Sequence, residues 1–266
     1  MSKLYIIPDA IHIEDSLALA EQYDAHFEYN DFYMPDIYGD TARVDALIDL
    51  YTALPRDRSL DTLHGAFLDV TVHSADAEIR AISDKRIRQS MEIAKRLGVC
   101  AVIFHTNLIA NFKTKSYIDS WVSKNAAYWR ALSTEYPDIG IYIENMFDSD
   151  PFPMTALMES LSDVPNVRAC FDFAHAAVFG KNVQEWTDSL LPYATHLHIN
   201  DNDGVADLHL EIGTGKLDYA PLCHALAESG VRPSVLIEMR DVSAQARSIE
   251  YMQKNHIYPF EKRAQA

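Results

Sequence analysis

The chain has 266 residues, of which 48% are hydrophobic and 23% are charged, and its formal net charge at pH 7 is −16. This length suits one large domain, and the ordinary composition excludes a disordered, collagen-like or coiled-coil protein. The negative charge disfavours nucleic acid as a partner, because nucleic-acid binders usually carry a basic patch that releases counterions from the phosphates.

Short apolar runs alternate with longer amphipathic segments along the chain. The apolar runs predict eight strands, at residues 4–8, 26–30, 62–67, 99–105, 140–145, 167–173, 195–200 and 234–239. The segments between them predict eight helices, at 13–23, 41–54, 84–97, 116–136, 154–161, 183–190, 219–228 and 244–255. Unbroken apolar runs such as CAVIF and SVLIE are typical of parallel strands covered on both faces. Eight such units, without a nucleotide-binding glycine motif, predict a single-domain (β/α)8 TIM barrel covering residues 1–266.

Local signals set some of the boundaries. Ser83 or Asp84 is expected to cap the third helix, and Gly98 to end it. The longest irregular stretches each follow a predicted strand: 31–40, 72–83 and 201–217. In a barrel, such segments form the mouth where substrates bind.

Cysteine usage and the first residues indicate the compartment. Cys100, Cys170 and Cys223 are odd in number and widely separated, which is typical of reduced thiols in a protein core. The opening MSKLYIIPDAIHIED lacks the apolar stretch of a signal peptide, and no run of 18 apolar residues occurs. We therefore expect a cytoplasmic protein with no membrane partner.

Six consecutive predicted strands, the third to the eighth, end in an imidazole or a carboxylate. These residues are His64, His105, Glu144, Asp172 with the nearby His175, His198 and Glu238. Such groups are costly to bury in an apolar barrel unless they are paired or bind a metal ion. Because parallel strands end at one mouth, their convergence predicts a site for divalent metal ions.

Two local spacings support a metal site. Asp207 and His209 lie two residues apart, so in extended chain both side chains point to one side and can bind one ion. Asp172 ends a strand and His175 lies in the turn after it, where the two can serve neighbouring ions. Nitrogen and oxygen ligands without thiolate suit zinc, manganese, cobalt or iron(II).

These ordered motifs resemble the xylose isomerase-like TIM barrel superfamily, which includes sugar isomerases, ketose epimerases and endonuclease IV-type apurinic endonucleases. The most specific segment is HLHINDNDGVADLHLEIGTGKLDY, which resembles the seventh-strand motif and the following loop with an Asp-x-His before a GxG turn. The resemblance begins at about the third strand, and the first two strands contribute little.

The resemblance implies two alternative ligand sets. The isomerases and epimerases generally hold one metal ion, and the matching residues are Glu144, Asp172, His198 and Glu238. The endonuclease IV-type enzymes hold three zinc ions with nine ligands, which match His64 and His105 with Glu144, the same four residues, and His175 with Asp207 and His209. The expected cofactor is therefore one to three divalent ions, zinc first, with manganese or another transition metal as alternatives.

Two enzymatic functions remain open. In a sugar or sugar-phosphate isomerase or epimerase, Glu144 and Glu238 would act as catalytic acid and base on either side of the reacting carbon. In an endonuclease IV-like phosphodiesterase, Glu144 would be a bridging ligand instead. The negative charge favours a small sugar or sugar phosphate over nucleic acid, whereas the complete nine-ligand match favours the phosphodiesterase. A metal-bearing binding protein without catalysis is a third class, and the oligomeric state stays open.

Residues beside the ligands are candidates for substrate binding. Asn200 and Asp201 could hydrogen-bond the substrate, support His198 or cap the next turn. Arg240 follows Glu238 directly and is the best placed of the loop cations to reach a phosphate or sugar oxygen.

Three residues are weaker candidates. His196 shares a strand face with His198 but lies one layer deeper, which is typical of a core histidine. Glu28 and Asn30 lie in an aromatic-rich stretch that is expected to pack over the barrel mouth.

Overall fold

The computed structural model describes residues 3–261 and contains a closed barrel of parallel strands. The strands are β1 Leu4–Ile6, β2 Ala25–Tyr29, β3 Thr62–His64, β4 Ala101–His105, β5 Gly140–Glu144, β6 Val167–Asp172, β7 Ala194–Ile199 and β8 Ser234–Ile237. Each strand pairs in parallel with the next along the chain, and β8 pairs with β1. The predicted (β/α)8 barrel is confirmed.

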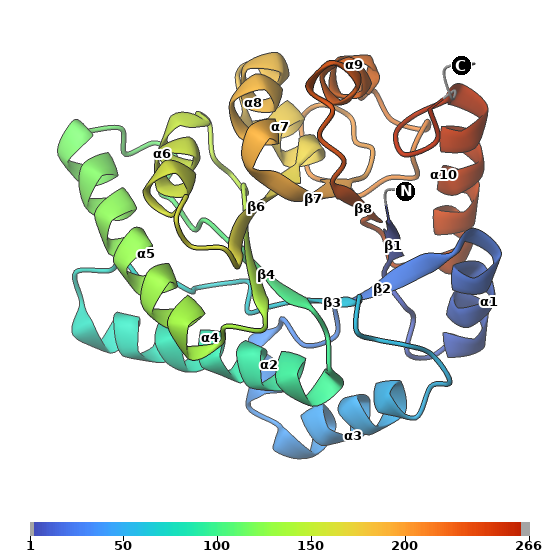
Figure 1. Ribbon diagram of the computed structural model, residues 1–266, viewed down its shortest axis with the longest axis horizontal. Helices are drawn as coiled ribbons and strands as arrows, with labels where there is room; N and C mark the ends of the chain where they lie inside the picture. The colour runs from blue at the N-terminus through green and yellow to red at the C-terminus, as the bar shows by residue number, and fades with distance from the viewer. Residues whose placement is uncertain (1–2, 262–266) are drawn as a thin grey trace.

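Helices surround the ring of strands on all sides (Figure 1). They are α1 Ile13–Tyr23, α2 Pro35–Tyr38, α3 Thr41–Thr52, α4 Ala77–Leu97, α5 Lys115–Glu135, α6 Phe152–Ser160, α7 Phe173–Phe179, α8 Val183–Leu190, α9 Ala220–Ser229 and α10 Val242–Asn255, with a 3-10 turn η1 at Leu191–Tyr193. Across residues 3–261, none of them has the length and apolar character that a membrane crossing requires.

The start of the third predicted helix is wrong by seven residues. Helix α4 begins at Ala77, because the side chain of Asp76 accepts a hydrogen bond from the Glu78 backbone N–H at 2.8 Å. Ser83 is buried inside the helix, where its hydroxyl donates to the Ile79 carbonyl and accepts from the Thr71 N–H. Gly98 ends the helix as predicted, in the left-handed conformation. The short helices α2 and α7 were not predicted.

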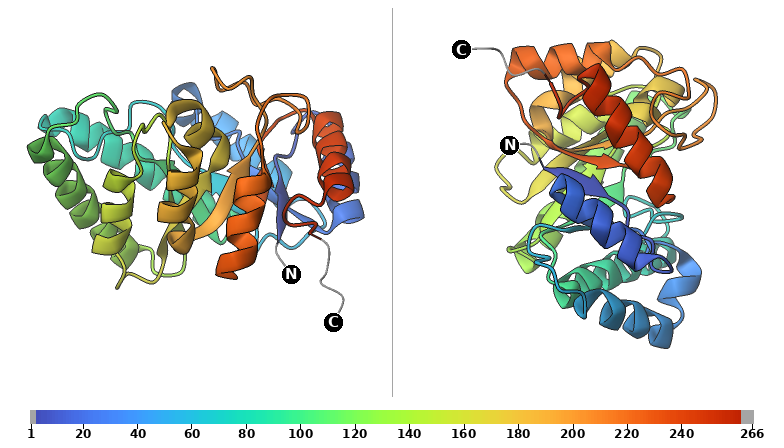
Figure 2. Two further views of the ribbon diagram at one scale, coloured as in Figure 1. Left: turned by 90° about the horizontal axis from the view of Figure 1, so that it is seen from above. Right: turned by 90° about the vertical axis from the view of Figure 1, so that its right-hand side faces the viewer.

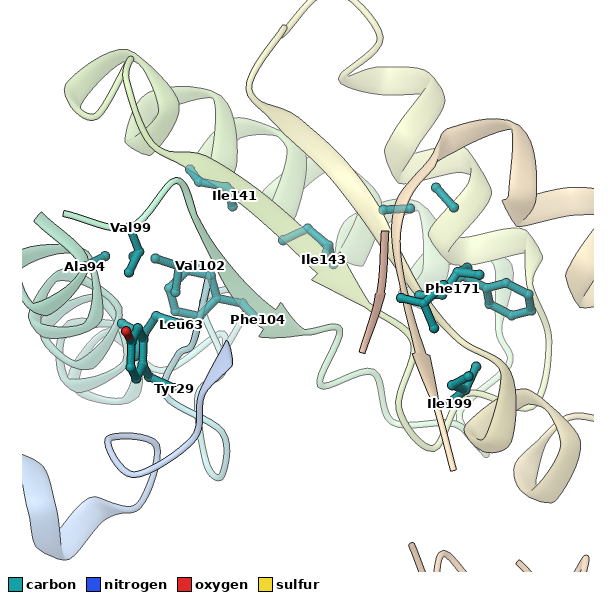
Figure 3. Close-up of a cluster of buried hydrophobic side chains, with 14 of the residues drawn as sticks. Tyr29, Leu63, Ala94, Val99, Val102, Phe104, Ile141, Ile143, Phe171 and Ile199 are labelled. Carbon is teal, nitrogen blue, oxygen red and sulfur yellow. The ribbon is translucent and has the colours of Figure 1, made fainter. Parts of the chain in front are cut away.

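The main hydrophobic core lies between the strands and the helices. Alternate strand residues face outward and pack there, as shown by Leu63, Val102 and Phe104 grouped with Tyr29 beside the helix that carries Ala94 (Figure 3). The remaining alternate residues face the interior of the barrel. A small apolar cluster of Tyr5, Ile7 and Leu236 lies apart from the main core. Polar side chains occupy much of the barrel interior, so the candidate functional groups lie inside the barrel.

Loops from strand ends to the following helices form the mouth. The loop between β7 and α9 is the most prominent, and it rises above the barrel in the left view of Figure 2. An antiparallel bridge between Asp201 and Leu210 shapes this loop. Cys100, Cys170 and Cys223 are free thiols. Backbone hydrogen bonds between Asp201 and Leu210 therefore hold this loop.

Candidate metal centre

All nine predicted ligands lie at the C-terminal mouth of the barrel. Six come from β3 to β8 or the residue directly after the strand: His64, His105, Glu144, Asp172, His198 and Glu238. His175 lies on α7, and Asp207 and His209 lie on the loop between β7 and α9. Strand register brings neighbours together, because His105 is paired with Glu144 and Asp172 with His198.

The nine side chains form three groups that match the predicted sets. Within each group the ligand atoms lie within 4.8 Å of one another. The groups are His64, His105 and Glu144; Glu144, Asp172, His198 and Glu238; and His175, Asp207 and His209. We name them the first, second and third ligand groups.

Glu144 connects the first two groups. Its Oε2 lies 3.1 Å from His105 Nε2 and 3.7 Å from His64 Nε2. Its Oε1 lies 3.3 Å from His198 Nδ1. Burial would raise the pKa of this carboxyl, but the His198 and His105 imidazoles outweigh burial and hold the pKa well below its ordinary value. Glu144 is thus an ionised carboxylate with a different set of neighbours on each oxygen.

The third group is held by main-chain carbonyls. His175 Nδ1 lies 2.8 Å from the Asn145 carbonyl, and His209 Nδ1 lies 2.9 Å from the Glu238 carbonyl. Both imidazoles therefore present Nε2 to Asp207 Oδ2, at 3.2 and 3.1 Å. Such contacts fix the ring orientation and the tautomer of histidines that bind metals.

Unpartnered buried atoms test whether the residues fit a metal ion. Among the described residues, several buried ligand atoms have no hydrogen-bond partner: Glu144 Oε1 and Oε2, Asp172 Oδ2, His105 Nε2, His198 Nδ1, Asp207 Oδ1 and Glu238 Oε2. Unsatisfied buried polar atoms are unfavourable, and a cation surrounded by carboxylates and imidazoles would satisfy them. The donors are nitrogen and oxygen, which fit zinc or a similar transition metal.

Cys170 is a further neighbour of the centre. It forms a group of potential ligands with Glu144 and His198. Burial raises the pKa of its thiol well above the ordinary value, which keeps the group neutral. Cys170 is thus a neighbour of the nine predicted ligands and is not one of them.

Asn145 was missed by sequence reasoning. Its side-chain amide donates to the Asp172 carbonyl at 2.8 Å, and its Oδ1 accepts from the Asp172 N–H at 2.9 Å. These bonds join the ends of β5 and β6, which carry Glu144 and Asp172. The only sequence signal is an amide directly after a ligand at a strand end.

Asp201 has contacts with the main chain of its own loop. Its Oδ2 accepts from the N–H groups of Gly213 and Gly215 at 2.9 and 3.0 Å, and its Oδ1 accepts from Leu217 at 3.0 Å. Of the roles that the sequence left open, these contacts match the turn-capping one. The neighbouring Asn200 is buried, and its Nδ2 lies 3.5 Å from His209 Nδ1.

Alanine in place of Asp201 is expected to release the loop that carries Asp207 and His209. Three backbone N–H groups would lose a charged acceptor, so we expect the free energy of unfolding to fall by about 3 kcal/mol or more. The third ligand group would lose its ion, as measured by metal analysis beside denaturant unfolding. Glu211→Gln on the same loop changes only a carboxylate that binds Arg247 and should leave both values near those of wild type. Full metal content in Asp201→Ala would contradict this role.

The centre opens into a pocket of about 480 Å³. Ligands line its floor, and its walls include Tyr33, Phe67, Met146, Phe147 and Met239. Arg240 lies at one side, with its guanidinium 5.6 Å from the Tyr33 ring centre and its Nη2 2.9 Å from the Asn30 carbonyl. The pocket thus offers aromatic surfaces and one cation beside the ligands.

A closed (β/α)8 barrel with three ligand groups at its C-terminal mouth, two of them fully buried, defines a TIM barrel protein with a candidate metal centre. The xylose isomerase-like TIM barrel family matches residues 23–255, and the chain belongs to this family. The resemblance seen in the sequence is confirmed.

Known relatives represent both branches of the family. The chain is 26% identical over 203 residues to a probable endonuclease 4 of Mycobacterium leprae, covering 71% of this chain and 75% of the relative. The fold is similar to that of a D-tagatose 3-epimerase-like protein, with a TM-score of 0.72, 21% identity and 96% coverage of both chains. It is equally similar to the TTHB071 protein of Thermus thermophilus from a crystal soaked with ZnCl2, with a TM-score of 0.72, 20% identity, and coverage of 96% of this chain and 99% of the other.

Proposed function

We propose that the protein is a metal-dependent isomerase or epimerase that acts on a small sugar or sugar phosphate at the barrel mouth. The observation that carries the proposal is the placement of two buried glutamates around one imidazole. His198 Nδ1 lies 3.3 Å from Glu144 Oε1 and 3.4 Å from Glu238 Oε2. Glu238 also lines the pocket. A substrate in the pocket would therefore lie next to Glu238, with the fully buried Glu144 beside the same nitrogen of His198.

The electrostatics keep both glutamates ionised, which is the form that a catalytic base needs. Burial would raise the pKa of Glu238, but His198 and His209 outweigh burial and lower it, as His198 and His105 do for Glu144. One ionised carboxylate can accept a proton from the carbon beside a carbonyl, and a glutamate on the other side that has taken up a proton from solvent can return one. A divalent ion held by the second ligand group would polarise the carbonyl and hydroxyl oxygens of such a substrate.

The charge of the mouth supports a small substrate over a nucleic acid duplex. On the loops that follow the strands, acidic residues outnumber basic ones. The acidic residues other than the ligands are Asp9, Asp31, Asp36, Asp40, Asp69, Asp76, Asp148, Asp150, Asp201, Asp203, Glu211, Asp218 and Asp241; the basic ones are Lys113, Lys181, Lys216 and Arg240. A duplex needs cations around the site to neutralise its phosphates.

A second candidate function is favoured by a specific observation. Glu144 Oε2 faces His64 and His105, which lie outside the second ligand group, and the third group adds another possible ion position. Several ions near one another are typical of phosphoesterases, in which Glu144 would serve as a bridging ligand instead of a base. This alternative is an endonuclease IV-like phosphodiesterase.

Metal stoichiometry tests the centre and separates the two functions. We expect at least one tightly bound transition metal ion per chain, and none in the second ligand group after Asp172→Ala with His198→Ala. A value near one ion supports the isomerase or epimerase, and a value near three supports the phosphodiesterase. A wild-type chain that stays metal-free after reconstitution would refute both.

Two assays test the reaction. Metal-loaded protein in deuterated water should exchange a carbon-bound proton of at least one member of a panel of ketoses and ketose phosphates, and mass spectrometry of the sugar detects this. Glu238→Gln, which keeps the shape of the side chain, should slow the exchange by about a hundredfold or more. A duplex with an abasic site should not be cleaved beyond background. Efficient cleavage without sugar exchange would replace the proposal with the phosphodiesterase.

A further inference from the structure

A second layer of buried ionisable groups lies in the barrel next to His198. Glu28 on β2 and His196 on β7 are buried, and neither belongs to the three ligand groups. Glu28 Oε1 lies 3.1 Å from His198 Nε2, and Glu28 Oε2 lies 3.3 Å from His196 Nε2. Thr62 donates a hydrogen bond to Glu28 Oε2 at 2.7 Å. The carboxylate therefore has one hydrogen bond, from Thr62, and an imidazole nitrogen close to each oxygen.

His198 is oriented differently from the other histidines of the centre. His64, His175 and His209 each have Nδ1 next to a main-chain carbonyl, which leaves Nε2 for the ligand group. His198 instead directs Nδ1 toward Glu144 and Glu238, and its Nε2 points to Glu28. Nδ1 can bind a metal ion only if it is free of its proton, so a neutral imidazole must carry the proton on Nε2.

We propose that Glu28 is a positioning residue for the metal centre. Its carboxylate accepts the Nε2–H of His198 and so aims the Nδ1 lone pair into the second ligand group. A carboxylate acceptor also makes the imidazole a stronger ligand than a neutral acceptor does. This inference rests on the metal centre of the proposed function, and it does not depend on which reaction the centre supports.

His196 and Ser234 extend the same network. His196 Nδ1 lies 2.6 Å from the Ser234 hydroxyl, which places its Nε2 toward Glu28. With His196 and Thr62 on Oε2, the other oxygen of the carboxylate is directed toward His198. A rigid support of this kind is needed because a ligand moved by a fraction of an ångström binds its ion less well.

Zinc affinity of the metal-free protein tests the proposal without an activity assay. Glu28→Gln keeps the size of the side chain and removes its charge, and we expect zinc to bind the second ligand group about tenfold to a hundredfold more weakly with unchanged stoichiometry. A competing chromophoric chelator measures this affinity. The matched control is Asp61→Asn, since Asp61 is also buried but binds Arg56, Tyr29 and the Phe27 N–H instead of a ligand. Its zinc affinity should stay within about threefold of wild type even if the protein is less stable.

The protonation state of His198 gives a second test on the wild-type protein, which needs no variant to fold. In zinc-loaded protein with 15N-labelled histidine, the nitrogen shifts should show a proton on Nε2 of His198 and none on Nδ1. Zinc affinity of Glu28→Gln equal to that of wild type, a proton on Nδ1, or an additional ion that disappears in His196→Gln would overturn the proposal. A wild-type chain that binds no zinc would refute the metal centre itself, whereas normal zinc binding by Glu28→Gln would refute only the role of Glu28.

Discussion

Glutamine in place of Glu144 is expected to disable two ligand groups at once and to slow turnover by about a hundredfold to ten-thousandfold. Both oxygens of this buried carboxylate face imidazoles, Oε2 toward His105 and His64 and Oε1 toward His198. The amide of glutamine has one oxygen and no charge, so it cannot serve both groups. No other residue in the described part of the chain is shared between two of the three groups.

Matched variants separate this effect from a general loss of ligands. His64→Gln changes only the first group and His209→Gln only the third, so each should lose no more than one ion. Metal analysis by mass spectrometry and rates of solvent proton exchange give the two readouts, with denaturant unfolding as the check on the fold. Wild-type metal content in Glu144→Gln would show that the carboxylate does not bridge the groups.

The barrel and its ligands could be predicted because both depend on local patterns. Apolar runs separated by amphipathic segments give the strand order, and parallel strands that close a barrel must end at one mouth. A histidine or acid at the end of each strand is therefore brought to a common site without any knowledge of side-chain packing. Asp207 and His209 were predicted by their spacing, and the structure places them together beside His175.

Helix starts and short helices were harder to predict. Ser83 looks like a helix cap, but its hydroxyl lies inside α4 and binds the loop at Thr71. Asp76, the residue that caps the helix, lies in a polar stretch where several residues could do the same. Helix α7 begins directly after β6, so its residues resemble the end of the strand.

Supporting residues had only a weak sequence signal, because their partners are distant in the chain. Glu28 alternates with outward-facing aromatic residues on β2, and its pairing with His198 exists only once the barrel closes. Asp201 was a possible turn cap among other roles, and only its contacts with the N–H groups of Gly213, Gly215 and Leu217 select that role. Ligands can thus be read from strand ends, while the groups that orient them depend on tertiary contacts.

The metal-free protein is expected to lose stability as the pH rises from about 6.5 to about 10, and bound zinc should cancel this loss. Burial would lower the pKa of His209, but Glu238 and Asp207 outweigh burial and raise it to about 10. Against the effect of burial, Asp172 and Asp207 raise the pKa of His175 well above the ordinary value, and Cys170 together with Glu144 does the same for His198. Burial raises the pKa of Asp172.

The direction of this stability change follows from the number of protons that the folded and the unfolded chain bind. An unfolded histidine loses its proton near pH 6.5, whereas these folded histidines keep theirs to higher pH. Above pH 6.5 the folded metal-free chain therefore binds more protons than the unfolded chain, and its stability falls by up to about 1.4 kcal/mol per pH unit for each retained proton. The pKa values of His105 and His196 are lowered, so these two imidazoles change the stability only below pH 6.5. Above pH 6.5 they are neutral in the folded and in the unfolded chain.

Zinc cancels this pH dependence because it binds the deprotonated ligands. Binding releases the retained protons, so zinc affinity should rise with pH over the same range. Thermal unfolding of the metal-free and zinc-loaded protein at pH 6.5, 7.5 and 8.5 should show midpoints that move apart as the pH increases.

His209→Asn provides the control for this pH dependence. It removes one of the retained protons, so the metal-free variant should lose stability less steeply with pH than the wild-type protein does. Parallel curves for the metal-free and zinc-loaded wild type would mean that the ligands bind no excess protons in the absence of metal. In that case the buried carboxylates and imidazoles would already be paired without protons, and the metal centre would lack the proton release that makes its zinc affinity depend on pH.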